Sequence, residues 1–232
     1  MEITLTHNNF LAILQLASPA LPVGAYGYSE GLEMLVENGT ITNADNLKFW
    51  LKSELIYGSI RLDAGVIVRA FHAVKTDDIE ALKRWNLWLS AARDTEELRA
   101  ASWQMGRSLI QLLGKLEPEI LPLVHAVGYP NNYAIAFAIA CAHWDINIQV
   151  CLLAYLHSWA NNLITAGIKL IPLGQTAGQE LLLGLQPLLT TTVEEILIMD
   201  DDDLGCCNWG LFDMRPFWSV WVFFGAKSDI SG

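Results

Sequence analysis

The residues of this chain that could act in catalysis, nucleotide binding or metal binding seldom occur at the spacings that these functions require. The sequence has no phosphate-binding string of the Gly-x-x-x-x-Gly-Lys-Ser/Thr type and no Gly-x-Ser-x-Gly elbow. No pair of histidines is spaced to place two metal ligands on one helical face; the five are His7, His72, His125, His143 and His157. We therefore predict no catalytic residue and no metal site within the chain. His143 and His157 occur in apolar stretches, where we expect hydrogen-bonded core imidazoles.

The acidic run at 200–203 and the cysteines also favour structural interpretations. Consecutive aspartates do not converge easily on one cation, so we interpret the run as a solvated helix break. The cysteines lack the spacing of metal-binding motifs, and adjacent cysteines rarely join each other in a disulfide. We expect reduced thiols at all four positions: Cys141, Cys151, Cys206 and Cys207.

In two segments rich in glycine and proline, packing does not explain which residues are present. Residues 18–33 read SPALPVGAYGYSEGLE, and residues 169–179 read KLIPLGQTAGQ. Proline stiffens the backbone, whereas glycine permits positive φ or the close approach of another element. Each segment is expected to form a rigid connection that presents polar side chains. From these residues alone, a purely structural role explains the segments as well as a recognition role does.

The rest of the chain has helical periodicity and no convincing strand pattern. The clearest apolar stripe extends from Leu98 to Leu116, with Thr95 as its N-terminal cap. The predicted helices cover about 10–17, 45–57, 63–74, 76–88, 95–116, 132–144, 147–169, 176–185 and 192–199. We expect the helices at 132–144 and 147–169 to pack tightly together, because the first is rich in alanine. The predicted fold class is all-α, a single-domain helical bundle of about ten helices.

Composition limits the classes of partner. The formal net charge of -11 and the pI near 4.8 argue against nucleic acid, because phosphate binding needs clustered lysine and arginine. Residues 146–168 carry no formal charge, but their asparagine, glutamine and histidine side chains would be costly in lipid, so we expect a core helix and no membrane span. The first residues lack the features of a signal peptide, so a cytoplasmic location is expected. A mean hydropathy of +0.31 is high and suggests burial against protein partners.

Four stretches occur in an order that resembles the urease accessory protein UreF family. They are residues 14–33, the Glu97-Leu-Arg99 and Gln104-Met-Gly-Arg107 strings, residues 169–179, and Asp202-Asp-Leu-Gly205. The resemblance covers about residues 10–211. It implies an all-helical, homodimeric cytoplasmic scaffold without catalytic activity that acts in assembly of the nickel centre of urease. Its implied partners are UreD (UreH in some organisms), the urease apoprotein and the GTPase UreG, so nickel and GTP would belong to partner proteins and the chain itself would need no cofactor.

The same resemblance implies which residues bind partners. Positions in the first segment match the family motif at Tyr26, Ser29, Gly31 and Glu33. Positions in the second match at Lys169, Pro172, Gln175 and Gly178. Among these eight, Tyr26, Glu33 and Lys169 are our predicted direct contacts.

The C-terminal end departs abruptly from the family pattern. Relatives continue after position 211 into a basic tail that contributes to partner binding, whereas residues 212–224 here read FDMRPFWSVWVFF. We therefore treat residues 1–211 as the domain and 212–232 as a divergent aromatic tail, and we hypothesise a reading-frame change in the coding sequence. This divergence bears directly on binding of UreD and UreG.

Two other classes of function are compatible with the residues. One is a small helical enzyme that uses carboxylates such as Glu33 and Asp63 in an apolar pocket. The other is a membrane-associated helical protein that uses the aromatic tail as its anchor.

Overall fold

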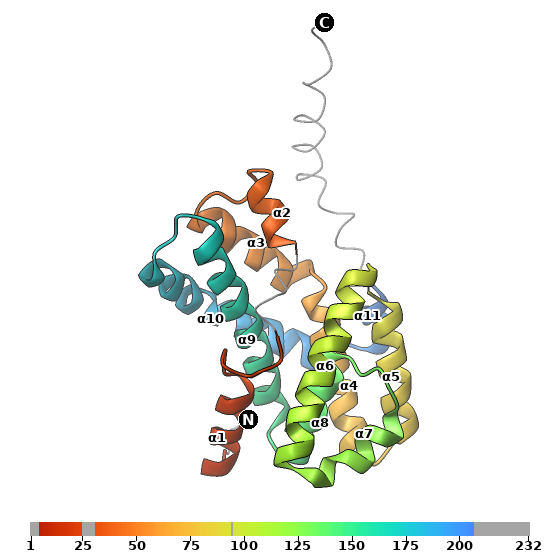
Figure 1. Cartoon of the computed structure of the whole chain (residues 1–232). Helices are drawn as coiled ribbons and strands as arrows, with labels where there is room; N and C mark the ends of the chain where they lie inside the picture. Colours follow the sequence, from red (N-terminus) through yellow and green to blue (C-terminus); the bar gives the residue numbers. More distant parts are fainter. Residues whose placement is uncertain (1–4, 25–30, 94, 207–232) are drawn as a thin grey trace, which may run out of the picture.

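A computed structural model of the chain describes residues 5–24, 31–93 and 95–206 (Figure 1). Tyr26, Ser29 and the tail at 212–232 lie outside these residues. The described part contains eleven α-helices, one 3-10 helix and no strand, which confirms the predicted all-α class. The helices are α1 (His7–Leu16), α2 (Leu32–Glu37), α3 (Ala44–Tyr57), α4 (Ile60–Lys75), α5 (Ile79–Ala91), α6 (Glu96–Leu116), η2 (Pro118–Ile120), α7 (Leu121–Val127), α8 (Tyr133–His143), α9 (Ile148–Leu170), α10 (Gln175–Ile198) and α11 (Asp201–Cys206).

Side-chain caps explain where several helices begin. Thr95 accepts a hydrogen bond from a backbone N–H of α6, as predicted, and Asn147 does the same for α9, at the start of the predicted range 147–169. The cap of α3 is Asn43, whose side chain accepts the N–H of Asn46 at 3.0 Å, so the helix begins one residue before the predicted range 45–57. Helix α2 was not predicted; only its first two residues, Leu32 and Glu33, belong to the segment that we expected to form a rigid connection.

The prediction of two separate helices at 176–185 and 192–199 is wrong. Helix α10 continues from Gln175 to Ile198, with Pro187 inside it. A proline in a helix interior removes one backbone hydrogen bond and normally favours a break or kink. Here Leu185, Leu189 and Val193 are buried on both sides of the proline, so tertiary packing keeps the helix continuous.

The helices form two groups that share α4. In the first, which we call the α4–α8 half, α4 packs against α5 and α8, and α6 packs against α8. In the second, the α9 half, α9 contacts α1, α2, α3 and α10. Helix α4 also touches α3, α9 and α10 and so joins the halves. The predicted partner of α8 was α9, but α8 packs mainly on α4 and α6 and touches α9 less extensively.

A polar network is buried inside the α4–α8 half. Arg93 forms an ion pair with Asp63 of α4, and burial raises the pKa of that carboxyl while the guanidinium acts in the opposite direction. Ser102 of α6 donates to Asn132 Oδ1 at 3.0 Å, and Asn132 Nδ2 donates to Asn86 Oδ1 of α5 at 3.0 Å. The network thus connects α4, α5 and α6 to the residue that precedes α8.

Candidate partner-binding site

The end of the first glycine- and proline-rich segment is a helix start. Gly31 is the N-terminal cap of α2 and has φ of 87°, a left-handed conformation that strongly favours glycine. Leu32 follows and is completely buried, so it anchors the short helix. Glu33 and Met34 are exposed, and Met34 has 61 % of its surface accessible. Positive φ at Gly31 therefore turns the chain so that Leu32 faces the core while its neighbours face solvent.

The second segment is the connection between α9 and α10. Helix α9 ends with Lys169 in its last turn, and the extended, buried Ile171 fastens the connection to the core. Pro172 then follows, and Gly174 in an extended conformation caps α10, which begins at Gln175. Lys169, Pro172 and Gln175 are all exposed. The segment presents these residues on a short connection that is fixed at both ends.

Two glycines bring the neighbouring helices close enough to support this connection. A Cβ added to Gly178 of α10 would lie 2.5 Å from Ile168 Cδ1 of α9. A Cβ added to Gly167 of α9 would lie 2.6 Å from Leu47 Cδ2 of α3. Gly178 is buried, so the structure gives this predicted site residue a packing position between α9 and α10, not a place on the surface.

Residues 31–33, which end the first segment, and the second segment lie at one end of the molecule. Helix α2 packs against α9, whose C-terminus leads into the second segment. Figure 1 shows α2, α3 and the α9–α10 connection together, in the upper left of the view. We call the exposed residues of this end, namely Gly31, Glu33, Lys169, Pro172 and Gln175, the α2/α9 end. The exposed Met34 belongs to the same surface and was missed because α2 was not predicted; the spacing of Leu32, Leu35 and Val36 was the available signal.

The carboxylates of the enzyme hypothesis have different surroundings. Asp63 is buried and paired with Arg93 in the polar network, whereas Glu33 is exposed on α2. Glu33 and Asp63 therefore do not share an apolar pocket.

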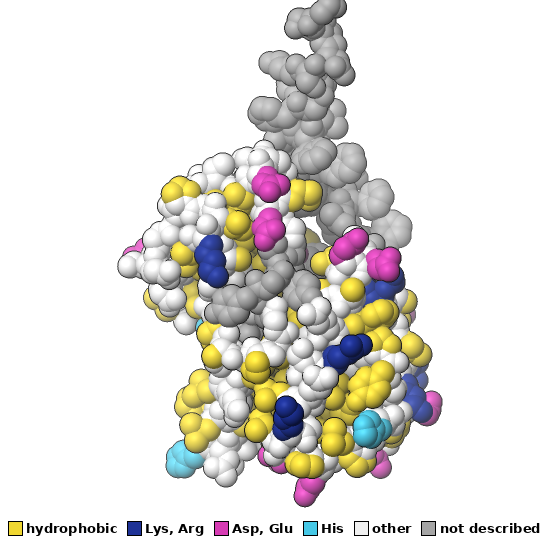
Figure 2. Space-filling view, in the orientation of Figure 1, with side chains coloured by type: hydrophobic (Ala, Val, Ile, Leu, Met, Phe, Trp, Pro, Cys, Tyr) yellow, Lys and Arg dark blue, Asp and Glu magenta, His cyan; other side chains and the backbone are white. Residues whose placement is uncertain are grey.

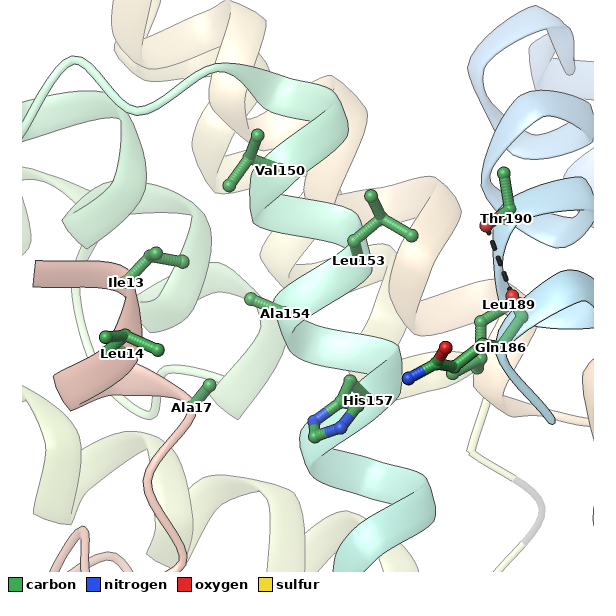
Figure 3. Close-up of a pocket in the computed structure, with 10 residues that line it drawn as sticks. All are labelled: Ile13, Leu14, Ala17, Val150, Leu153, Ala154, His157, Gln186, Leu189 and Thr190. Atoms are coloured by element: carbon green, nitrogen blue, oxygen red, sulfur yellow. Dashed lines mark hydrogen bonds between the residues drawn. The ribbon is translucent and has the colours of Figure 1, made fainter. Parts of the chain in front are cut away.

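A separate pocket of about 380 Å³ lies between α1, α9 and α10 (Figure 3). Most of its walls are aliphatic, and the Gln186 amide and the His157 ring project toward one another. Burial lowers the pKa of the half-buried His157, which favours the neutral imidazole. None of the described lining residues is a carboxylate or a cysteine: Ile13, Leu14, Ala17, Val150, Leu153, Ala154, His157, Gln186, Leu189 and Thr190. His143, expected in the core as well, is exposed at the end of α8, so that expectation is wrong.

Apolar side chains are spread over the surface, as the composition suggested. Figure 2 shows them over both halves on the face in view, with acidic and basic side chains scattered between them. Large examples with more than half their surface accessible include Leu11 of α1, Phe49 of α3 and Leu183 of α10. Such residues supply apolar area to any surface that docks a partner.

Two further observations concern metals and membranes. Among the described residues, no group of three or more histidine, cysteine, aspartate or glutamate side chains could hold a metal ion. One described helix, α10, is long and apolar enough to cross a membrane by length and composition alone, and 39 % of its most apolar window is buried in the protein. Helix α9, which contains most of the uncharged stretch at 146–168, has Leu152, Leu156 and Leu163 buried in the core, as predicted.

The protein is all-α, and five of the six predicted site residues that the structure describes are exposed at the α2/α9 end. The profile of the UreF family matches residues 41–186. A urease accessory protein UreF of Nostoc sp. is 71% identical over 208 residues, which cover 90% of this chain and 91% of that protein. The UreF of Trichormus variabilis is 68% identical over 209 residues, with 90% and 91% covered. The more distant UreF of Alkalilimnicola ehrlichii is 40% identical over 194 residues, with 82% and 83% covered. The chain belongs to the UreF family of urease accessory proteins.

Proposed function

We propose that this chain is a non-catalytic scaffold for nickel insertion into urease. In this proposal it binds UreD (UreH), and through it the urease apoprotein, and it recruits the GTPase UreG. Membership of a family whose relatives carry the name urease accessory protein supports the accessory role. The motifs that carry the resemblance then point to the α2/α9 end as the surface for recruitment.

The site proposal rests mainly on one observation: the α9–α10 connection is held by buried residues and presents exposed residues to solvent. Ile171 and Gly178 are buried and hold the connection in place, while Lys169, Pro172 and Gln175 are exposed on it. A preorganised surface loses little conformational entropy on binding, which favours recognition. Glu33 and Lys169 supply charges of opposite sign that a complementary partner surface would meet.

Lys169→Ala tests the site, and Lys115→Ala is a matched control. Both lysines are exposed and occupy the last turn of a long helix, α9 and α6 respectively. Capture of UreG by the chain in the presence of UreD should weaken about tenfold for Lys169→Ala, the loss typical of an interface contact, and stay unchanged for Lys115→Ala. Equal capture by the two variants would remove Lys169 from the proposed surface.

The accessory role itself has an independent test. Deletion of the gene should abolish nickel-dependent activation of urease while urease subunits are still made. Normal activation in the deletion strain would refute the role, whatever the outcome with Lys169.

The proposal includes a homodimer in the cytoplasm that takes its nickel and GTP chemistry from partner proteins and binds neither nucleic acid nor membrane. Sedimentation of the purified chain checks the dimer, and co-sedimentation with lipid vesicles checks the membrane alternative. Vesicle binding that disappears when residues 212–232 are removed would instead favour the aromatic tail as an anchor.

A further inference from the structure

A loop of the α4–α8 half reaches the surface between α5 and α6. Residues 128–132 connect α7 to α8, and the Asn86 side chain of α5 donates from Nδ2 to the Pro130 carbonyl at 2.8 Å. On the other side of the loop, a Cβ added to Gly106 of α6 would lie 2.1 Å from a backbone oxygen of the loop. Contacts with both helices therefore fix this loop, on which Tyr129 and Pro130 are exposed.

Large apolar side chains lie on the surface around the loop. Leu87, which follows Asn86 on α5, has 70% of its surface accessible, and Tyr129 has 59%. Trp103 of α6 is half-buried, and its indole Nε1–H donates to Ser90 Oγ at 3.1 Å. The same Oγ accepts a hydrogen bond from the buried polar network at 2.8 Å. The indole is thus tied to the interior and loses little conformational freedom when a partner covers it.

Two arginines of α6 flank this tryptophan. Arg99, Trp103 and Arg107 are spaced four residues apart and so form a stripe about 12 Å long on the helix. The central guanidinium carbon of Arg99 lies 5.8 Å from the centroid of the Trp103 ring. A guanidinium over an aromatic face keeps its N–H edges available for a carboxylate. Neither arginine forms an ion pair with an acidic side chain of the described residues.

These residues form a basic and apolar surface on an acidic chain. We call it the α5/α6 patch, and it consists of Leu87, Arg99, Trp103, Arg107, Tyr129 and Pro130. None of its members is acidic, although the chain has a net charge of -11. Figure 2 shows Lys or Arg side chains over α6, with hydrophobic side chains beside them. Tryptophan, tyrosine and arginine are the residue types that most often dominate the binding energy of protein interfaces.

We propose that the α5/α6 patch docks an acidic segment of a partner protein, in which two carboxylates about 12 Å apart flank an apolar side chain. The carboxylates pair with Arg99 and Arg107, and the apolar side chain packs on Trp103 and Leu87. This inference does not depend on the proposed scaffold function. The patch belongs to the α4–α8 half, whereas the α2/α9 end belongs to the other half.

The charge of the chain favours protein carboxylates over a lipid or nucleic-acid surface. Membranes and nucleic acids present many phosphates at close spacing, and binding to them needs clustered lysine and arginine. The patch supplies two arginines, and the net charge of -11 opposes approach to an extended anionic surface. A short acidic segment matches the two arginines without bringing a large negative charge close to the rest of the chain.

Fluorescence anisotropy with the full chain tests the proposal. The probe is a fluorescein-labelled Glu-Glu-Leu-Trp-Glu-Glu peptide, in which glutamates four residues apart are about 13 Å apart when the peptide is extended. The comparison peptide has glutamine in place of every glutamate. The acidic peptide should bind, about tenfold more tightly than the glutamine peptide, and raised salt should weaken its binding. Equal affinity for the two peptides, or no binding of the acidic one, would overturn the proposal.

Arg107→Ala and Lys115→Ala locate the site on the protein. Both side chains are exposed on α6, but Arg107 lies about 80° around the helix from Arg99 and Lys115 about 160°. Binding of the acidic peptide should weaken about tenfold in Arg107→Ala and stay unchanged in Lys115→Ala. Circular dichroism should show the same helix content for both variants, since both changes are at the surface. Equal peptide binding by the two variants would overturn the assignment.

Co-sedimentation with vesicles of phosphatidylcholine and phosphatidylserine tests the lipid alternative. The amount of chain that sediments should be the same with and without Arg107→Ala. Vesicle binding that is lost in Arg107→Ala and kept in Lys115→Ala would assign the α5/α6 patch to lipid headgroups and overturn the proposal.

Discussion

The α4–α8 half contains a buried polar network, whereas the α9 half presents exposed residues at the α2/α9 end. In the first half, Asp63, Arg93, Ser102 and Asn132 are mutually paired inside the protein. In the second, Lys169, Pro172 and Gln175 are exposed on a connection supported by buried neighbours. Both regions contain polar side chains, but those of the first are buried and those of the second are exposed, so the physical consequences differ.

The difference separates residues that specify the fold from residues available to partners. A buried polar group that loses its partner pays the full cost of desolvation, so the network in the α4–α8 half should be intolerant of substitution. An exposed polar group exchanges protein contacts for water at little cost, so Glu33, Lys169 and Gln175 at the α2/α9 end should tolerate substitution in folding and respond only in binding.

The largest expected effect is Asp63→Ala. Removal of the buried carboxylate that faces Arg93 should lower the free energy of unfolding by about 3 kcal/mol, as for other buried ion pairs that lose one member. Urea denaturation followed by circular dichroism measures the change. The double variant Asp63→Leu with Arg93→Met should recover most of the loss, since it removes both charges; a single-variant loss below about 1 kcal/mol would show that the network does not specify this half.

An intermediate effect is expected for Gly106→Ala, with Gly184→Ala as its control. A Cβ at Gly106 of α6 would collide with the backbone carbonyl of Asn131, which cannot move without disturbing the network, so a loss of about 2 kcal/mol is expected. Gly184 lies on the exposed side of α10, where the nearest atom to an added Cβ is Lys48 Nζ at 3.6 Å. Gly184→Ala should raise stability by about 0.5 kcal/mol through helix propensity. Thermal unfolding of both variants distinguishes them, and a common sign would contradict the assignment of Gly106 to close packing.

The smallest expected effect on folding is Gln175→Ala. Gln175 is exposed at the start of α10, so its loss should change the free energy of unfolding by less than about 0.5 kcal/mol. The same denaturation assay measures this, in parallel with UreG capture. A loss as large as that of Gly106→Ala would place Gln175 among the residues that hold the fold and weaken the contrast between the halves.

Local sequence signals predicted much of the secondary structure. The caps at Thr95 and Asn147 and the stripe from Leu98 to Leu116 describe interactions within one or two helical turns, which neighbouring residues decide by themselves. The short α2 escaped prediction because a helix of six residues has few turns to stabilise it, and its packing against α9 is a tertiary contact. Of the predicted site residues that the structure describes, Gly31, Glu33, Lys169, Pro172 and Gln175 are exposed and Gly178 is buried.

The sequence by itself determined the all-α class, the starts of five helices to within one residue (α3, α6, α8, α9 and α10) and, through its ordered motifs, membership of the UreF family. Only the tertiary structure decided that α10 continues through Pro187 and that Asp63 pairs with Arg93. Helix periodicity and caps are local and can be read from adjacent residues. Burial and ion pairing depend on which helices meet, and only the packing of the whole chain settles that.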